Sequence, residues 1–266
     1  MMVLITADLH LDAWMRENRD PFASTAPIIS HLDALIIAGD LANNPMYQWP
    51  RALARIGRLI DPARVWIIPG NHDYWNLHLD GDAALEVLVT EAGMNFAQKR
   101  IIDIGATRFL CCSLWTDFAL TNDRDEAMRR ARMTMSDYTR IRKNGALAGG
   151  AISPEDIVAV HQDHLDWLTF AMAEPWEGQR IIVTHHAPTA AAVAPLNGLS
   201  AAFASDLEGW IGTHRPDGWF FGHTHRQFAA NIHGVPVTNV SLGYPDDVAN
   251  GREAEQLLRG LVSMEA

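Results

Sequence analysis

The 266-residue chain has little cysteine, no long apolar run and fewer basic than acidic side chains. Its two cysteines, Cys111 and Cys112, are adjacent, so on a strand they would point to opposite faces and would not pair. No apolar run approaches the roughly 18–20 residues of a membrane-spanning helix. Residues 1–11 lack the basic and apolar regions of a signal peptide. These absences predict a cytoplasmic protein without membrane contact.

Charge and missing motifs exclude further classes. The 21 Lys and Arg against 32 Asp and Glu leave a formal net charge of −11 at pH 7, which argues against extended nucleic-acid binding. The chain has neither a phosphate-binding G-x-x-x-x-G-K loop nor a G-x-G-x-x-G dinucleotide fingerprint. It also lacks the H-E-x-x-H helix of zinc proteases and the G-x-S-x-G elbow of serine hydrolases. The composition leaves the oligomeric state open.

What the chain does contain is twelve histidines, and half of them follow short apolar runs. Each run ends in glycine or polar residues, as expected for buried strands that open into loops. The runs span residues 3–7, 34–38, 65–68, 181–183 and 218–221. In layered α/β folds ligands bind at this carboxyl edge of the strands. The pattern therefore predicts an α/β fold with one site at the strand ends.

The intervening segments predict helices and further strands. Apolar residues at helical spacing indicate helices over 47–59 and 82–91, and Ser153-Pro154 begins a helix that runs toward Ala171. Residues 100–117 and 231–242 predict additional strands, and residues 253–262 an amphipathic helix. Residues 119–150 are rich in charge and contain no strand end, so they predict a helical cap inserted into a single domain of residues 1–266.

The strand-end side chains form a mixed set of donors. They are Asp8, His10, Asp40, Asn71, His72, His185, His186, His223 and His225. Carboxylate and imidazole together suit Mn, Fe, Co, Ni and Zn, whereas Ca and Mg prefer oxygen ligands. The set is too large for one tetrahedral ion and suits two ions that share a carboxylate. Paired ions clamp the attacking and leaving oxygens of an in-line displacement at phosphorus.

Five blocks follow one another along residues 3–245. They are Asp8-Leu-His10, Gly39-Asp40, Gly70-Asn-His-Asp73, His185-His-Ala-Pro188 and Gly222-His-Thr-His225. In this order the chain resembles the calcineurin-like metallophosphoesterase superfamily. The resemblance implies a four-layer α/β/β/α sandwich of two mixed β-sheets flanked by helices. It also implies two metal ions, Mn or Fe being favoured, and hydrolysis of a phosphate ester by a metal-bound hydroxide. A non-catalytic metal-binding scaffold of this fold is the alternative.

The same resemblance implies a role for each donor. Asp40 bridges the ions, and the other ligands are Asp8, His10, Asn71, His185, His223 and His225. Either histidine of the 185–186 pair suits the ligand position, and the family's paired-histidine blocks use the first, which leaves His186 behind it. His72 matches the histidine that contacts the phosphate and protonates the leaving oxygen. Phosphatase members often carry an aspartate where this chain has Asn43. Because an amide does not raise imidazole basicity as a carboxylate does, a phosphodiester or activated substrate is favoured over a monoester.

The predicted cap concentrates positive charge. Seven of the 21 basic residues lie within 20 positions: Arg124, Arg129, Arg130, Arg132, Arg140, Arg142 and Lys143. One interpretation is a lid whose Arg140 and Arg142 hold a second phosphate or a nucleotide tail, with Tyr138 stacking on the substrate. The other is a solvated helix face with ion pairs between residues three or four apart. A capped cleft suits a small anionic phosphate ester.

Six histidines lie outside the five blocks, and two of them are three residues apart on a predicted helix. This pair, His161 and His164, has the spacing to bind a stray ion. We expect surface or hydrogen-bonded side chains there rather than metal ligands.

Overall fold

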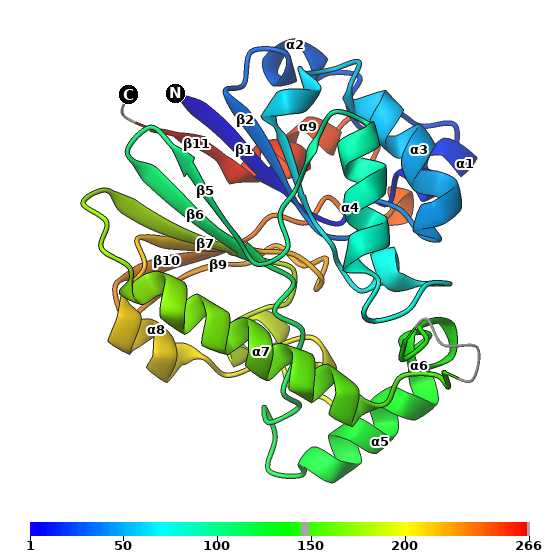
Figure 1. Ribbon diagram of the computed structural model, residues 1–266, viewed down its shortest axis with the longest axis vertical. Helices are drawn as coiled ribbons and strands as arrows, with labels where there is room; N and C mark the ends of the chain where they lie inside the picture. Colours follow the sequence, from blue (N-terminus) through cyan, green and yellow to red (C-terminus); the bar gives the residue numbers. More distant parts are fainter. Residues whose placement is uncertain (145–148, 265–266) are drawn as a thin grey trace.

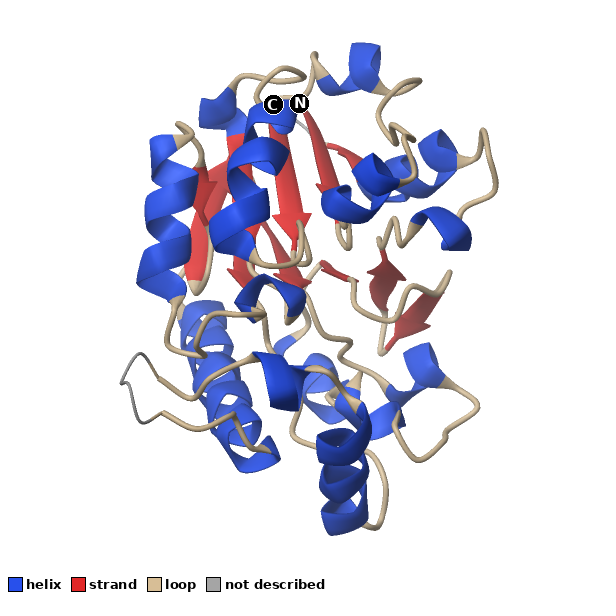
Figure 2. Cartoon of the chain, turned by 90° about the vertical axis from the view of Figure 1, so that its right-hand side faces the viewer, coloured by secondary structure: helices blue, strands red, loops and turns tan. Residues whose placement is uncertain are grey.

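Two mixed β-sheets lie face to face between layers of helices in the computed structural model, which describes residues 1–144 and 149–264 (Figures 1 and 2). The first sheet has the strand order β11-β1-β2-β3-β4, with β1 Met2–Thr6, β2 Ala34–Ala38, β3 Val65–Ile68, β4 Asn95–Phe96 and β11 Leu261–Ser263. The second has the order β5-β6-β7-β8-β10-β9, with β5 Arg100–Ile104, β6 Thr107–Cys112, β7 Gln179–Thr184, β8 Gly218–Phe221, β9 Ala229–Ile232 and β10 Val235–Asn239.

Successive side chains of each strand point to opposite faces of the sheet, and this alternation produces the apolar layers of the fold. On β2, Ala34 and Ile36 pack between the two sheets, whereas Leu35 packs against the helices outside. On β6, Cys111 faces the space between the sheets and Cys112 the opposite side, and both thiols are buried and free. Three apolar clusters result, one between the sheets and one on each outer face. This is the four-layer α/β/β/α sandwich of the prediction.

The helices fall on the two outer faces (Figure 1). On the side of the first sheet lie α1 Leu11–Arg16, α2 Ala26–Ile29, α3 Pro45–Ile56 and α4 Asp82–Glu91. On the side of the second sheet lie α7 Pro154–Ala173 and α8 Glu208–His214. Helix α7 begins where predicted, because Ser153 and Asp156 form a capping box. Among the described residues, no helix combines the length and apolarity that a bilayer crossing requires.

Short 3₁₀ helices occupy several of the connections: Pro62–Arg64, His72–Tyr74, Ala190–Val193, Ser200–Ala202, Pro245–Asp247 and Leu258–Gly260. The predicted C-terminal helix over 253–262 is wrong at its end, because a 3₁₀ turn over Leu258–Gly260 follows helix α9 (Glu253–Leu257) and a strand begins at Leu261. This strand, β11, pairs antiparallel with β1, with Met2 opposite Ser263. The edge of β1 would otherwise leave its backbone N–H and C=O groups unpaired, and this pairing outweighs the helical spacing of the side chains.

The predicted cap region contains α5 Arg124–Thr134 and α6 Asp137–Arg140. Figure 1 shows both helices at the end of the molecule opposite the chain termini, beside the start of α7. Backbone hydrogen bonds attach this segment to the loop after β3: the Asn76 N–H donates to the Arg140 carbonyl (2.8 Å), and the Arg142 N–H donates to the Leu77 carbonyl (3.0 Å). Of the predicted cap, residues 145–148 lie outside the described residues.

Candidate metal centre

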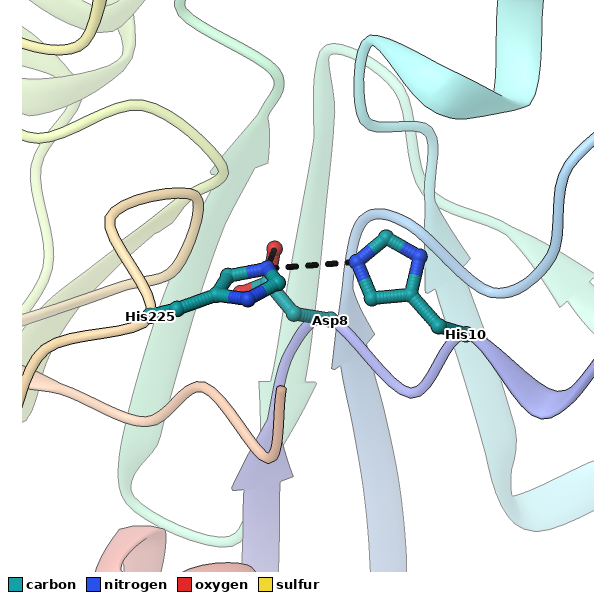
Figure 3. Close-up of side chains that lie close together, drawn as sticks. All are labelled: Asp8, His10 and His225. Atoms are coloured by element: carbon teal, nitrogen blue, oxygen red, sulfur yellow. Dashed lines mark hydrogen bonds and ion pairs between the residues drawn. The ribbon is translucent and has the colours of Figure 1, made fainter. Parts of the chain in front are cut away.

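The loops after the strands bring the predicted ligands into one buried cluster. Three groups of side chains have their donor atoms within 4.8 Å of one another: Asp8, His10 and His225; His10, Asp40 and His72; and Asp40, His185 and His223. Figure 3 shows the first group, with the rings of His10 and His225 turned toward each other beside the Asp8 carboxylate. Their Nε2 atoms are 3.2 Å apart.

The backbone turns sharply at these residues. Five of the predicted ligands have left-handed backbone, with φ between 39° and 65°: Asp8, His10, Asp40, His223 and His225. This conformation costs a non-glycine residue about 1–2 kcal/mol and is typical of functional sites. Two neighbouring glycines are required for space, because a side chain on Gly70 would collide with the Asp40 carboxylate and one on Gly222 with the Asp8 carboxylate.

Asp40 stands at the centre of the cluster. Its Oδ2 is 3.7 Å from His10 Nε2, and its Oδ1 is 3.5 Å from His185 Nε2. One carboxylate thus faces two separate groups of ligands, which is the arrangement expected of a bridging residue. Burial, reinforced by the charge of Asp8, raises the pKa of Asp40 well above its ordinary value. Positive charge between these groups would relieve both effects.

Hydrogen bonds to the far side of two histidine rings direct their Nε2 atoms inward. His185 Nδ1 donates to the Ala38 carbonyl (2.9 Å), and His225 Nδ1 donates to Asp247 Oδ2 (2.9 Å). Metal-bound histidines are held in this way by carbonyl or carboxylate groups. The His223 Nε2 is buried with no hydrogen-bond partner among the described residues. Burial lowers the pKa of His223 well below its ordinary value, so the ring stays neutral and keeps this lone pair.

The donor set fits borderline transition ions. It combines carboxylates, imidazoles and one amide oxygen, the ligand types that Mn, Fe, Co, Ni and Zn accept. Burial opposes ionisation of Asp8, but the charge of His225 outweighs it and holds the pKa of Asp8 well below its usual range. The Asp8 carboxylate is therefore ready to bind a cation at neutral pH.

The structure separates the two adjacent histidines. The His185 ring faces Asp40, and its Nε2 lies 3.0 Å from Asn71 Oδ1. The His186 ring lies behind the cluster, with Nδ1 3.4 Å from the Ser113 carbonyl and its ring 5.2 Å from that of Trp115. This geometry fits His185 as the ligand and His186 as a supporting residue.

His72 lies at the edge of the cluster, next to Asn43. Its Nδ1 donates to Asn43 Oδ1 (2.6 Å), and its Nε2 is 3.9 Å from Asp40 Oδ2. Asn43 in turn donates from Nδ2 to Asp12 Oδ2 (3.0 Å), which orients the amide oxygen toward the imidazole. Asn43 thus occupies the position of the expected histidine partner, with a carboxylate one hydrogen bond further away. Burial, with the charge of His185, lowers the pKa of His72 to about 3.

A cavity of about 340 Å³ opens onto the cluster. Its walls include Asn71, His72, Trp75, Asp137, Phe203 and Tyr244. A second cavity of about 300 Å³, with Arg226 in its wall, shares Phe203 and Thr224 with the first. The ligand cluster therefore borders the first cavity, and the second cavity adjoins the first.

The three cap residues predicted to contact the substrate, Tyr138, Arg140 and Arg142, lie outside the walls of the first cavity, which the cap lines with residues 135–137 instead. Tyr138 is buried in the apolar core, and Arg142 is exposed with its backbone bonded to the loop after β3. The Arg140 guanidinium stacks on Trp75, 4.4 Å from the ring centroid. On α5, Arg129 and Arg130 form ion pairs with Glu126, so part of the basic segment is the solvated face of the second interpretation.

Several aspartates that hold the ligands in place received no role from the sequence. Asp73 accepts hydrogen bonds from the backbone of Asp40, Leu41 and Gly70 and from the Trp49 indole. Asp137 accepts from Asn71, and Asp247 from His225. Asp73 and Asp12 each lie two positions after a predicted ligand in the sequence. This closeness could have marked them as supporting residues. No local pattern marks Asp137 or Asp247.

Comparisons with known proteins agree with this geometry. The family model described as calcineurin-like phosphoesterase matches residues 1–227. The chain is similar to the uncharacterized protein L509 of Acanthamoeba polyphaga mimivirus, at 22% identity over 81% of this chain and 80% of that protein.

Two solved structures share the fold. One is a phosphopantetheinyl hydrolase from Mycobacterium tuberculosis, with a TM-score of 0.69 and 17% identity over 92% of this chain and 90% of that one. The other is a dimetal phosphatase from Danio rerio, with a TM-score of 0.53 and 13% identity over 90% of this chain and 86% of that one. With a family match that spans most of its length and every ligand position of the five blocks filled, the chain belongs to the calcineurin-like phosphoesterase family.

Proposed function

We propose that the protein is a dinuclear metal-dependent phosphoesterase that hydrolyses a phosphodiester or a small nucleotide-like ester in preference to a monoester. The observation that carries the proposal is the position of Asp40, whose two oxygens face two separate groups of buried ligands. Asp8, His10 and His225 would hold one ion, and Asn71, His185 and His223 the other. When bound, the ions supply Lewis acidity and neutralise charge that develops on the phosphoryl oxygens.

The residues around the ions orient the ester and handle the proton. His72 lines the cavity, and because its Nδ1 proton is used by Asn43, the neutral ring presents the Nε2 lone pair to the substrate side. To protonate a leaving oxygen, Nε2 must first take up a proton, which the low pKa of His72 disfavours. We therefore expect turnover to depend strongly on the leaving group, with activated esters reacting fastest.

The adjoining cavities support a diester. A phosphodiester carries two organic substituents on phosphorus, and the two spaces that share Phe203 and Thr224 offer room for one on each side. A monoester needs only one of them. A phosphopantetheinyl hydrolase has the same fold. A phosphopantetheinyl ester therefore belongs among the substrates to be tested, beside cyclic and dinucleotide diesters.

The test is hydrolysis of bis-p-nitrophenyl phosphate and p-nitrophenyl phosphate by metal-stripped protein reloaded with Mn²⁺, Fe²⁺ or Zn²⁺. We expect turnover that a chelator abolishes, and kcat/KM at least about tenfold higher for the diester, a difference of about 1.4 kcal/mol in transition-state stabilisation. Two bound ions without turnover of any ester would instead indicate a metal-binding scaffold. Faster hydrolysis of the monoester would contradict the diester preference.

A further inference from the structure

The cap contributes a buried carboxylate to the wall of the metal centre. Asp137, the first residue of α6, is only 4% exposed. Its Oδ1 accepts two hydrogen bonds, one from Asn71 Nδ2 (2.9 Å) and one from Trp75 Nε1 (2.7 Å). One carboxylate oxygen from the cap therefore holds two side chains of the loop that follows β3.

The first of these hydrogen bonds determines which end of the Asn71 amide faces the ligand cluster. An amide has one oxygen that can bind a cation and one NH₂ group that cannot. Because Nδ2 donates to Asp137, Oδ1 points to the other side, where it lies 3.0 Å from His185 Nε2. With the amide rotated by 180°, the NH₂ group would face the ligands, and the oxygen would meet the Asp137 carboxylate. Asp137 excludes this orientation.

The second hydrogen bond acts on the indole that supports His72. The Trp75 ring stacks on the His72 imidazole, with centroids 3.8 Å apart and 27° between the planes. The Arg140 guanidinium covers the same indole. Asp137 holds Nε1 at the edge of this ring, so the stack of Arg140, Trp75 and His72 is anchored at its middle member.

We propose that Asp137 is a positioning residue of the metal centre: through Asn71 it presents an amide oxygen to the second ion, and through Trp75 it fixes the plane of His72. The inference rests on the proposed dinuclear function, because the second ion is what the Asn71 oxygen serves. The cap is then part of the metal centre, joined to it by this carboxylate and by the backbone hydrogen bonds of residues 140–142 to residues 76–79.

The experiment is Mn²⁺ titration by calorimetry of metal-stripped protein, which requires no turnover. We expect wild type to bind two ions, and Asp137→Ala to lower the affinity of one of them roughly 10–100-fold, the usual effect of removing a group that orients a ligand. Asp137→Asn keeps an oxygen acceptor for both donors and should restore affinity to within about threefold of wild type. Asp125→Ala, an exposed acid of the same cap, is the matched control and should bind as wild type does.

A double-mutant cycle separates positioning from general destabilisation. In an Asn71→Ala background, Asp137→Ala should have no further effect on the affinity for the second ion, because the side chain that it orients is gone. A merely structural role would lower the affinity in both backgrounds alike. If Asp137→Ala fails to fold, Asp137→Ser replaces it in the cycle.

The outcomes are distinct from those that test the function. Wild type that fails to bind two ions would overturn the dinuclear proposal itself. Two ions bound by wild type and by Asp137→Ala with equal affinity would overturn the role of Asp137 and leave the phosphoesterase proposal standing. If Asp137→Ala lowered the affinity for the second ion equally in wild type and in the Asn71→Ala background, the role of Asp137 would also be overturned.

Discussion

Histidines are buried in two regions of this protein, at the strand ends and on helix α7, and the regions differ in what surrounds the ring nitrogens. At the strand ends, His10 and His225 direct Nε2 atoms at each other beside the Asp8 carboxylate. On α7, His161 is also buried, but its Nδ1 lies 3.1 Å from the Leu114 carbonyl, and His164 Nδ1 has no hydrogen-bond partner among the described residues. Within the same residues, neither α7 histidine forms an ion pair with a carboxylate.

The comparison shows what a metal centre requires beyond buried imidazole. Burial lowers the pKa of His10 at the strand ends and of His164 on α7, so each region holds a neutral ring with a lone pair. Within the part of the chain that the structure describes, only the strand ends direct carboxylates and imidazoles from several strands to shared points. The α7 pair comes from a single helix, and His161 Nδ1 faces the backbone carbonyls of Leu114 and Trp115. Both α7 histidines are under 4% exposed, so the surface alternative is wrong, whereas His161 is hydrogen-bonded, as the other alternative expects.

The largest predicted effect concerns the central carboxylate. Asp40→Ala should remove a ligand shared by both ions and lower kcat/KM about 10³-fold or more, since bound metal contributes several kcal/mol to catalysis. Elemental analysis should show that both ions are reduced. His161→Leu is the counterpart from the second region and should keep two ions per chain. If Asp40→Ala kept both ions, the strand-end cluster would need no bridging carboxylate. The contrast between the strand ends and α7 would then be wrong on this point.

Local sequence was sufficient to predict that the proposed ligands lie together, and insufficient to predict the residues that hold them. Each predicted ligand follows an apolar run, so its place at the sheet edge can be derived from a few neighbouring residues. Asp137 is 66 positions from the Asn71 amide that it holds, and Asp247 is 22 positions from His225. Only tertiary packing brings such pairs together. The strands β2, β3 and β8 follow the predicted bounds for the same local reason, whereas β11 depends on the distant edge of β1.

The next effect is on stability. Asp73 is fully buried, and its carboxylate accepts from backbone N–H groups of the Asp40 and Gly70 loops. Asp73→Ala would leave these donors and the Trp49 indole without a partner, at a cost of about 3 kcal/mol in the free energy of unfolding. Urea unfolding of metal-free protein measures it. Asp125→Ala, in the exposed cap, should change stability by less than about 0.5 kcal/mol.

An Asp73→Ala protein as stable as wild type would show that the two loops hold their shape without the carboxylate. The strand-end region would then resemble α7, whose two histidines form no ion pair with a carboxylate among the described residues. We expect the opposite, because the left-handed backbone at Asp40 needs support from its surroundings.

A smaller effect tests the role of His72. His72→Ala should keep both ions, since His72 lies at the edge of the ligand cluster. It should lower kcat for a diester with an alkyl leaving group by less than the ordinary contribution of a proton donor, about 10²-fold, because the low pKa of His72 disfavours the protonated ring. The loss should be smaller still for p-nitrophenolate, which leaves without protonation. The measurement is kcat for a series of diesters of rising leaving-group pKa. Equal losses across the series would assign His72 to phosphate binding rather than to proton transfer.

The smallest predicted effect is a pH dependence of stability that arises from His164 on α7. Burial lowers the pKa of His164 to about 3, against about 6.5 in the unfolded chain. Above pH 6.5 both states are neutral and the group contributes nothing. As the pH falls from 7 to 5, the unfolded state takes up the proton and the folded state does not, so the free energy of unfolding should drop by about 2 kcal/mol through this group.

His164→Leu should remove that share of the acid sensitivity, measured by urea unfolding of metal-free protein at each pH. Gln162→Leu, which changes the exposed face of the same helix without removing a titratable group, should retain the wild-type slope. An unchanged slope in His164→Leu would mean that the folded protein protonates this ring, and the contrast between the two histidine regions would then rest on the carboxylates alone.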